Sequence, residues 1–150
     1  MSMPALTVQH VDGDRFTIGI RDHLVDVDQP VSDGGEDTAP TPTELFVASL
    51  ASCVAFYARR YLARHHLPTT GLRVTTDYRM GSHPSRVSDV RIGIALDSAL
   101  PRERREALLA VAAHCTVHNS LTHPPVIDIA LGDSRSSTVG RVDGLGTTVT

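Results

Sequence analysis

The chain has 150 residues, a formal net charge of −3 and no lysine among its 14 basic residues. This length suits a single domain with its own hydrophobic core. The weakly acidic balance excludes a broad basic surface, so we expect no nucleic-acid partner. Residues 1–5 lack a basic segment followed by an apolar stretch, which predicts a cytoplasmic protein without a secretory signal.

The N-terminal segment has the alternation of half-buried strands. Apolar and polar residues alternate over residues 6–10 and 15–20, and Asp12-Gly13-Asp14 between them is a turn signal. A third short strand is predicted over residues 24–27, which completes an antiparallel meander. Residues 29–40 are rich in Gly, Asp and Pro and form a loop that leads into a helix.

A central helix is predicted over residues 41–66. Thr41 suits the N-cap, Pro42 the first helical position, and Glu44 the returning side chain of a capping box. Residues 45–57 are almost wholly apolar or small, with Cys53 in their middle. A helix apolar on all sides is covered on all sides. The covered part, residues 45–58, is shorter than the ~20 residues of a membrane span, so we expect no membrane partner.

The second half of the chain predicts two strands, a helix and a last strand. The strands cover residues 72–80 and 87–96, the helix residues 101–114, and Cys115 follows the helix end. One further turn is predicted over residues 116–121 and a strand over 126–131, which closes a single domain of residues 1–131. Residues 132–150 are polar and Gly-rich and are interpreted as a surface tail.

The predicted order of elements is typical of an α+β fold, with helices packed on antiparallel sheets. A small domain with one sheet covers only one side of an all-round apolar helix. A second subunit can cover the other side, so we expect a homodimer.

The two cysteines carry the candidate chemistry. A cytosolic location disfavours a structural disulfide, and neither CxxC spacing nor a His-rich pair supports a metal site, so no metal or other cofactor is expected. If the sulfurs of Cys53 and Cys115 meet, thiol redox chemistry follows: one thiolate attacks an oxidant and the other resolves the sulfenic acid as a disulfide. A buried thiol then needs a nearby cation, for which Arg is suited. His114 and His118 flank Cys115, either as groups that tune its thiolate or as helix-end polar residues.

Three stretches together resemble the OsmC/Ohr family, over about residues 6–131. They are Pro42-Thr-Glu-Leu-Phe-Val-Ala-Ser-Leu-Ala-Ser-Cys53, the preceding Asp28-Gln-Pro and Gly34-Gly35, and Cys115-Thr-Val-His-Asn-Ser-Leu121 followed by Pro125. The resemblance implies an OsmC-like fold, with antiparallel sheets wrapped around a buried central helix in an intertwined homodimer and active sites at the subunit interface. It also implies a peroxidase that reduces organic hydroperoxides and is recycled by a dithiol or low-molecular-weight thiol.

The resemblance further implies a role for each site residue. Cys53 corresponds to the peroxidatic cysteine and Cys115 to the resolving one. The family's activating arginine comes from the N-terminal hairpin, where Arg15 is the first candidate and Arg21 the alternative, and a glutamate at the helix start holds it. Glu44 is the candidate for that glutamate.

The sequence departs from the family pattern at the helix start. Thr43 stands directly after the proline, where the peroxidases have Glu, and Glu44 lies one place later, about 100° around the helix. This departure favours an alternative: an OsmC-like protein with weak or no peroxidase activity that binds an apolar small molecule at the dimer interface. A hydrolase that uses Cys115 with His118 or His114 is a third hypothesis, although no oxyanion-hole signature supports it.

Overall fold

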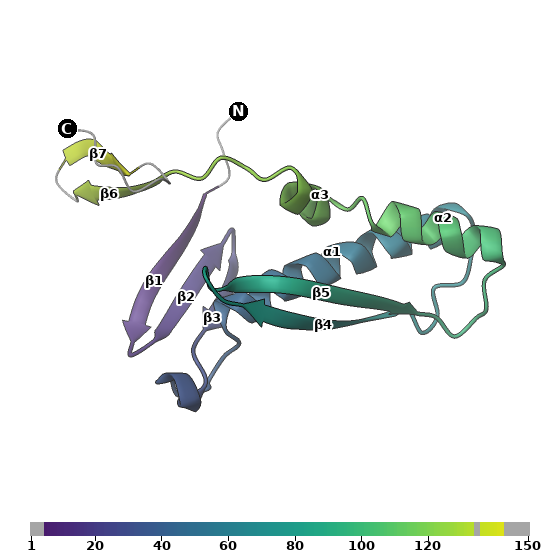
Figure 1. Cartoon of the computed structure of the whole chain (residues 1–150), viewed down its shortest axis with the longest axis horizontal. Helices are drawn as coiled ribbons and strands as arrows, with labels where there is room; N and C mark the ends of the chain where they lie inside the picture. The colour runs from purple at the N-terminus through teal and green to yellow at the C-terminus, as the bar shows by residue number, and fades with distance from the viewer. Residues whose placement is uncertain (1–4, 134–135, 143–150) are drawn as a thin grey trace.

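The computed structural model describes residues 5–133 and 136–142 and confirms the α+β class (Figure 1). The strands form one three-stranded antiparallel sheet, of order β1-β2-β3, and two antiparallel hairpins, β4-β5 and β6-β7. The elements in chain order are β1 (Leu6–Asp12), β2 (Arg15–Ile20), β3 (His23–Val27), η1 (Val31–Asp33), α1 (Pro42–Arg64), β4 (Arg73–Gly81), β5 (Arg86–Ala95), α2 (Arg102–Ala112), α3 (Thr116–Thr122), β6 (Ile129–Asp133) and β7 (Ser136–Val142).

The N-terminal sheet is the predicted meander. Asp12 pairs with Arg15 across the first turn, where Gly13 takes a left-handed φ of 48° that favours glycine. The sheet lies beyond the N-terminal end of α1 and does not cover it (Figure 1). Several of its large apolar side chains stay exposed as a result, with Leu6 at 58% and Leu24 at 77%, whereas Val27 at the end of β3 is buried.

One buried carboxylate holds the loop between β3 and α1. Asp28, 1% exposed, accepts hydrogen bonds from the backbone N–H groups of Gln29, Glu36 and Thr38 at 2.8, 3.3 and 3.0 Å and from the Thr38 hydroxyl at 2.8 Å. A Cβ on Gly35 would lie 2.0 Å from the carbonyl oxygen of Gln29, so only glycine fits there. The loop therefore brings the chain to the start of α1 in a fixed conformation.

The capping box predicted at the start of α1 is confirmed. Thr41 Oγ1 accepts a hydrogen bond from the Glu44 N–H at 3.1 Å, and Glu44 Oε2 accepts one from the Thr41 N–H at 2.8 Å. Pro42 occupies the first helical position, where its missing N–H costs nothing. The helix then runs for 23 residues.

Within this chain, α1 is covered on one face. The elements α2, α3, β4 and β5 pack against it. The buried residues share this face and are Val47, Leu50, Val54, Ala58, Tyr61 and Leu62. Phe46 and Phe56 point away from it and are 41% and 52% exposed. The cover predicted for all sides of the helix is therefore not supplied by the single chain.

In the part of the chain that the structure describes, α1 is the one helix long and apolar enough to cross a membrane by length and composition. Its mean hydropathy over 18 residues is 1.2. Core helices of soluble proteins satisfy the same criterion, and 33% of this stretch is buried in the protein. The predicted exclusion of a membrane span by length is therefore not confirmed, and it is the packing of α2, α3, β4 and β5 against α1 that supports a core helix.

The C-terminal hairpin differs from the predicted tail. Strand β6 pairs with β7, with Ile129 opposite Val142 and Leu131 opposite Gly140. Residues 134–135 and 143–150 of the predicted tail lie outside the described residues. The Ser-, Thr- and Gly-containing segment of β7 has little apolar alternation, so only its partner strand identifies it as a strand.

Candidate active site: a buried thiol pair

Cys53 lies near the middle of α1, at the edge of its buried face. It is half-buried and packs against a fully apolar cluster formed by Leu50, Val54, Ala112 and Cys115. The i,i+3 and i,i+4 spacing of a helix places residues 50, 53 and 54 on adjoining rows. The helix therefore presents the thiol to the same interior that holds the second cysteine.

Cys115 connects α2 to α3 and is fully buried, at 0% exposure. It is the N-cap residue of α3, with φ −67° and ψ 158°, and its Sγ accepts a hydrogen bond from the backbone N–H of His118 at 3.4 Å. Sequence analysis placed Cys115 at the end of a helix, but its role as the cap of the next helix was not predicted. Cysteine is outside the usual set of capping residues, so no sequence signal indicated this role.

The two free thiols lie next to each other, and their proximity shapes the electrostatics of the site. Burial raises the pKa of the Cys115 thiol above its usual range, and the neighbouring Cys53 thiol raises it further. The backbone N–H groups of His118 and Val117 offset part of this effect on the pKa. Cys115 is therefore held as a neutral thiol, and the half-buried Cys53 is the more accessible nucleophile.

A hydrogen bond missed by the sequence analysis ties the two cysteine-bearing segments together. The Tyr57 hydroxyl and the Thr116 hydroxyl lie 2.8 Å apart. Tyr57 follows Cys53 by one helical turn, and Thr116 directly follows Cys115. The position of Tyr57 on the Cys53 side of the helix was visible in the sequence, but its partner, 59 residues away, was not.

Neither predicted histidine directs its ring at a sulfur. His114 Nδ1 donates to the Ala110 carbonyl at 2.7 Å, and His118 Nδ1 donates to the Ala113 carbonyl. It is the backbone N–H of His118 that contacts Cys115. Both rings therefore bind backbone carbonyl groups of the segment that precedes Cys115.

The predicted activating groups lie elsewhere within this chain. Arg15 Nε donates to Asp12 Oδ1 at 2.9 Å in a partly exposed ion pair, and Arg21 lies in the exposed turn between β2 and β3. Glu44 is occupied by the capping box, and Thr43 precedes it in the helix. The structure brings Cys53 and Cys115 together but places neither arginine beside them, so an activating arginine stays a prediction.

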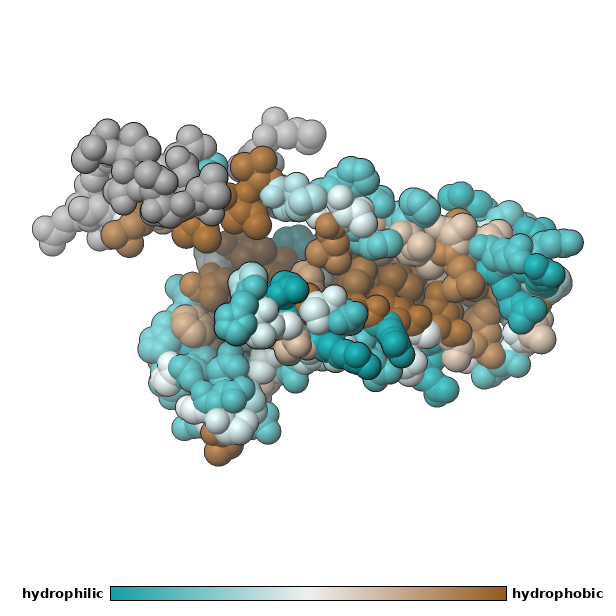
Figure 2. Space-filling view, in the orientation of Figure 1, coloured by the Kyte–Doolittle hydropathy of each residue, from teal (hydrophilic) through white to brown (hydrophobic). Residues whose placement is uncertain are grey.

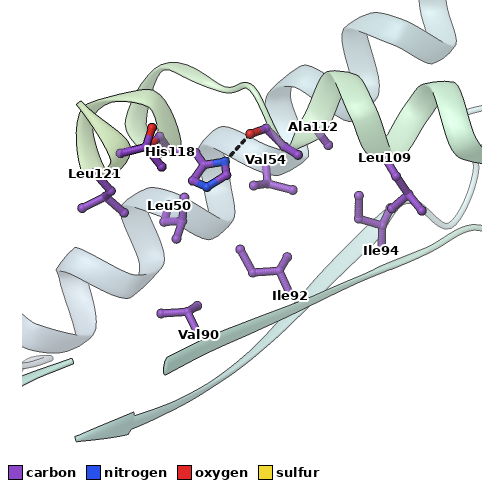
Figure 3. Close-up of a pocket in the computed structure, with 11 residues that line it drawn as sticks. Leu50, Val54, Val90, Ile92, Ile94, Leu109, Ala112, His118 and Leu121 are labelled. Atoms are coloured by element: carbon purple, nitrogen blue, oxygen red, sulfur yellow. Dashed lines mark hydrogen bonds between the residues drawn. The ribbon is translucent and has the colours of Figure 1, made fainter. Parts of the chain in front are cut away.

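A cavity of about 440 Å³, here called the apolar pocket, adjoins the thiol pair between α1, β5, α2 and α3 (Figure 3). Figure 2 shows apolar side chains gathered in the hollow between the β4-β5 hairpin and the helices α2 and α3. The lining residues are Leu50, Val54, Val90, Ile92, Ile94, Leu109, Ala112, Ala113, His118, Leu121 and Thr122. Neither cysteine is among them, although Leu50, Val54 and Ala112 belong both to this lining and to the cluster that holds Cys115.

Among residues 5–133, no three His, Cys, Asp or Glu side chains converge in a way that could hold a metal ion. The polar groups near the cysteines are hydroxyls, imidazoles and backbone amides. Their arrangement suits thiol chemistry in an apolar interior.

Comparisons with known proteins place this arrangement in a family. A family model described as OsmC-like protein matches residues 34–130. No curated protein sequence matches the chain. Several solved structures share its fold.

A protein from Psychrobacter arcticus, named for an osmotic stress and detoxification response, is 24% identical with a TM-score of 0.74, and the match covers 80% of this chain and 89% of that one. The organic hydroperoxide resistance protein OsmC from Legionella pneumophila is 21% identical with a TM-score of 0.57, covering 81% and 91%. A protein from Vibrio cholerae, classed with organic hydroperoxide resistance proteins and holding captopril in one of its active sites, is 18% identical with a TM-score of 0.57, covering 83% and 88%. At these identities the structures share the fold, and the family model spans more than half of the chain, so the chain belongs to the OsmC-like protein family.

Proposed function

We propose that this protein is a thiol peroxidase that reduces organic hydroperoxides, with Cys53 as the attacking cysteine and Cys115 as the resolving cysteine. The observation that carries the proposal is the contact between two free thiols inside an apolar cluster. The difference between them supports the assignment, because Cys53 is half-buried whereas Cys115 is fully buried with a raised pKa. Family membership and the names of the Legionella and Vibrio relatives agree with this activity.

The reaction balances in three steps. The Cys53 thiolate attacks the terminal oxygen of ROOH, so the O–O bond breaks, a sulfenic acid forms on Cys53, and the alkoxide takes a proton to leave as ROH. The Cys115 thiol then attacks the sulfenic sulfur, which forms the Cys53–Cys115 disulfide and releases water. Two external thiols, or one dithiol, reduce this disulfide by exchange and leave as the oxidised disulfide. The apolar surroundings favour substrates with a hydrocarbon body over hydrogen peroxide.

We propose that the working unit is a homodimer. The single chain leaves Phe46 and Phe56 of α1 exposed, together with apolar side chains of the N-terminal sheet. A second subunit that covers this surface would also change the surroundings of Cys53, and we propose that it brings Arg15, or in its place Arg21, to the thiol. Light scattering of the purified protein should give the mass of two chains, and a monomer would contradict this part of the proposal.

The test of the chemistry is a count of free thiols by mass spectrometry before and after one equivalent of cumene hydroperoxide, with hydrogen peroxide as the control oxidant. We expect the wild type to lose both thiols and to yield a Cys53–Cys115 cross-linked peptide. The matched variants separate the roles. Cys115→Ser should stop at a sulfenic acid that dimedone traps on Cys53, and Cys53→Ser should remain unreacted. Full peroxidase activity in Cys53→Ser would overturn the proposal.

A specific observation also favours a second candidate function. Arg15 and Glu44 are engaged with Asp12 and Thr41, and Thr43 stands where the peroxidases have Glu. Without an activated thiolate, the protein would be a binding protein for an apolar small molecule at the dimer interface. In that case both thiols survive cumene hydroperoxide, and native mass spectrometry finds a co-purified ligand.

A further inference from the structure

The apolar pocket has the composition of a small-molecule site. Its volume of about 440 Å³ lies in the range of ligand-binding cavities, which are mostly apolar with a few placed polar groups. Nine of its lining residues are aliphatic, and the other two are His118 and Thr122. No charged carboxylate, arginine or lysine lines it, so a ligand there must be uncharged.

The Thr122 hydroxyl is engaged near its own helix, including a 3.2 Å contact with His123 Nδ1, whereas the His118 ring is bonded through Nδ1. The Thr122 hydroxyl lies 3.3 and 3.2 Å from the carbonyls of His118 and Asn119, to which it donates within its own helix. His118 Nδ1 is bonded to the Ala113 carbonyl, which only accepts, so Nδ1 carries the proton. In the neutral ring Nε2 is then an acceptor. Figure 3 shows this second ring nitrogen directed into the space between Leu50 and Ile92.

We propose that the apolar pocket binds an uncharged, largely hydrocarbon molecule with one hydroxyl group, of the class of alkylphenols and long-chain alcohols, whose O–H donates to His118 Nε2. The bond from Nδ1 to Ala113 fixes both the tautomer and the direction of the ring, so the acceptor is oriented before a ligand arrives. This site goes beyond the proposed peroxidase, because neither cysteine is among the residues that line it. All of its lining residues belong to a single chain.

The experiment is an NMR titration of the intact protein with 4-hexylphenol and with its methyl ether, which keeps the shape but has no donor. We expect amide shifts at α3 and β5, and binding of the phenol about two- to tenfold tighter than the ether, as one hydrogen bond provides. His118→Gln should keep this preference, because its Oε1 can replace Nε2. His118→Asn should lose it, because its amide can still donate to Ala113 but does not reach the pocket.

A second pair of variants tests the location and does not alter the histidine. Leu121→Trp places a larger side chain at the pocket rim and should weaken the binding of both compounds, whereas Val31→Trp, on the exposed η1 segment, should weaken neither. The proposal is overturned if neither compound binds, which would mean that the second subunit fills the pocket. It is also overturned if His118→Asn keeps the preference for the phenol, or if Leu121→Trp binds both compounds as the wild type does. None of these readouts depends on thiol oxidation, so the peroxidase proposal stands or fails separately.

Discussion

Replacing Tyr57 by phenylalanine removes the hydroxyl that joins α1 to α3. The bond to Thr116 is 2.8 Å long, Tyr57 is half-buried, and Thr116 is exposed. Because the bond connects the residue one turn after Cys53 with the residue next to Cys115, its loss should loosen the placement of one thiol relative to the other. The change should affect disulfide formation more than the first attack on peroxide.

The size of the effect follows from the geometry. A hydrogen bond within a protein contributes a net ~0.5–1.5 kcal/mol to the free energy of unfolding. Thr116 is exposed, so its hydroxyl can bond water once Tyr57 is changed. The contribution of this bond to the free energy of unfolding therefore lies in the lower half of that range, at about 0.5–1 kcal/mol. The same free energy corresponds to a disulfide-forming step that is about two- to fivefold slower.

The assay is a double-mutant cycle of Tyr57→Phe and Thr116→Val, read by urea unfolding at one protein concentration, because the stability of the proposed homodimer would depend on concentration. Thr116→Ser is the matched control, since it keeps the hydroxyl. Rapid-quench mass spectrometry then follows the loss of the Cys53 thiol and the appearance of the disulfide separately. A coupling free energy below about 0.2 kcal/mol, or an unchanged rate of disulfide formation in Tyr57→Phe, would refute the role assigned to this bond.

Three further predictions concern the cap and the two buried acids. Thr41→Ala should lower the free energy of unfolding by about 1 kcal/mol, because it removes one half of the capping box; an unchanged urea midpoint would contradict this. The Cys115 pKa is raised by burial, so the folded state holds a proton that the unfolded state releases above about pH 9. Stability should therefore fall with pH from there upward, and less steeply in Cys115→Val, as thermal unfolding between pH 8 and about 10.5 can show. Hydrogen bonds from Thr38 above all lower the Asp28 pKa, so this carboxylate stabilises the fold above the unfolded pKa of about 3.8 and loses the contribution as pH falls through its lower folded pKa. Asp28→Asn should be less stable at neutral pH and should lack this acid-dependent loss; an acid-unfolding curve parallel to the wild type would contradict the assignment.

The parts of the fold that were predicted correctly depend on residues close in sequence. The capping box needs only Thr41 and Glu44, three residues apart, and the hairpins follow from alternation on either side of a turn. The half-buried face of β5, with Val90, Ile92 and Ile94, is also a local pattern. Such signals are set by backbone geometry and need no knowledge of what packs against them.

The parts that were missed depend on partners far apart in the chain. Asp28 looks like an ordinary loop residue until Glu36 and Thr38 fold back onto it. The bond between Tyr57 and Thr116 joins two helices whose packing the sequence does not reveal. Strand β7 is likewise defined by its ladder with β6.

The sequence analysis named the two cysteines of the candidate site, but it did not identify the groups that surround them. A mid-helix Cys53 and a second cysteine after a later helix indicated thiol chemistry, but only the fold brings their sulfurs into contact. The sequence left His118 open, either as a group that tunes the Cys115 thiolate or as a polar residue at a helix end. The structure instead assigns the contact to its backbone N–H, because Nδ1 is bonded to Ala113.

Because Cys115 Sγ caps α3, a chemical change at this sulfur affects the stability of the helix. A helix of seven residues is too short to be stable on its own and depends on its cap and its packing. Here the acceptor is Cys115 Sγ, so any group bonded to that sulfur competes with the His118 N–H for its place. The rate of hydrogen exchange at this one amide should therefore report whether the sulfur 3.4 Å away is a free thiol or has been modified.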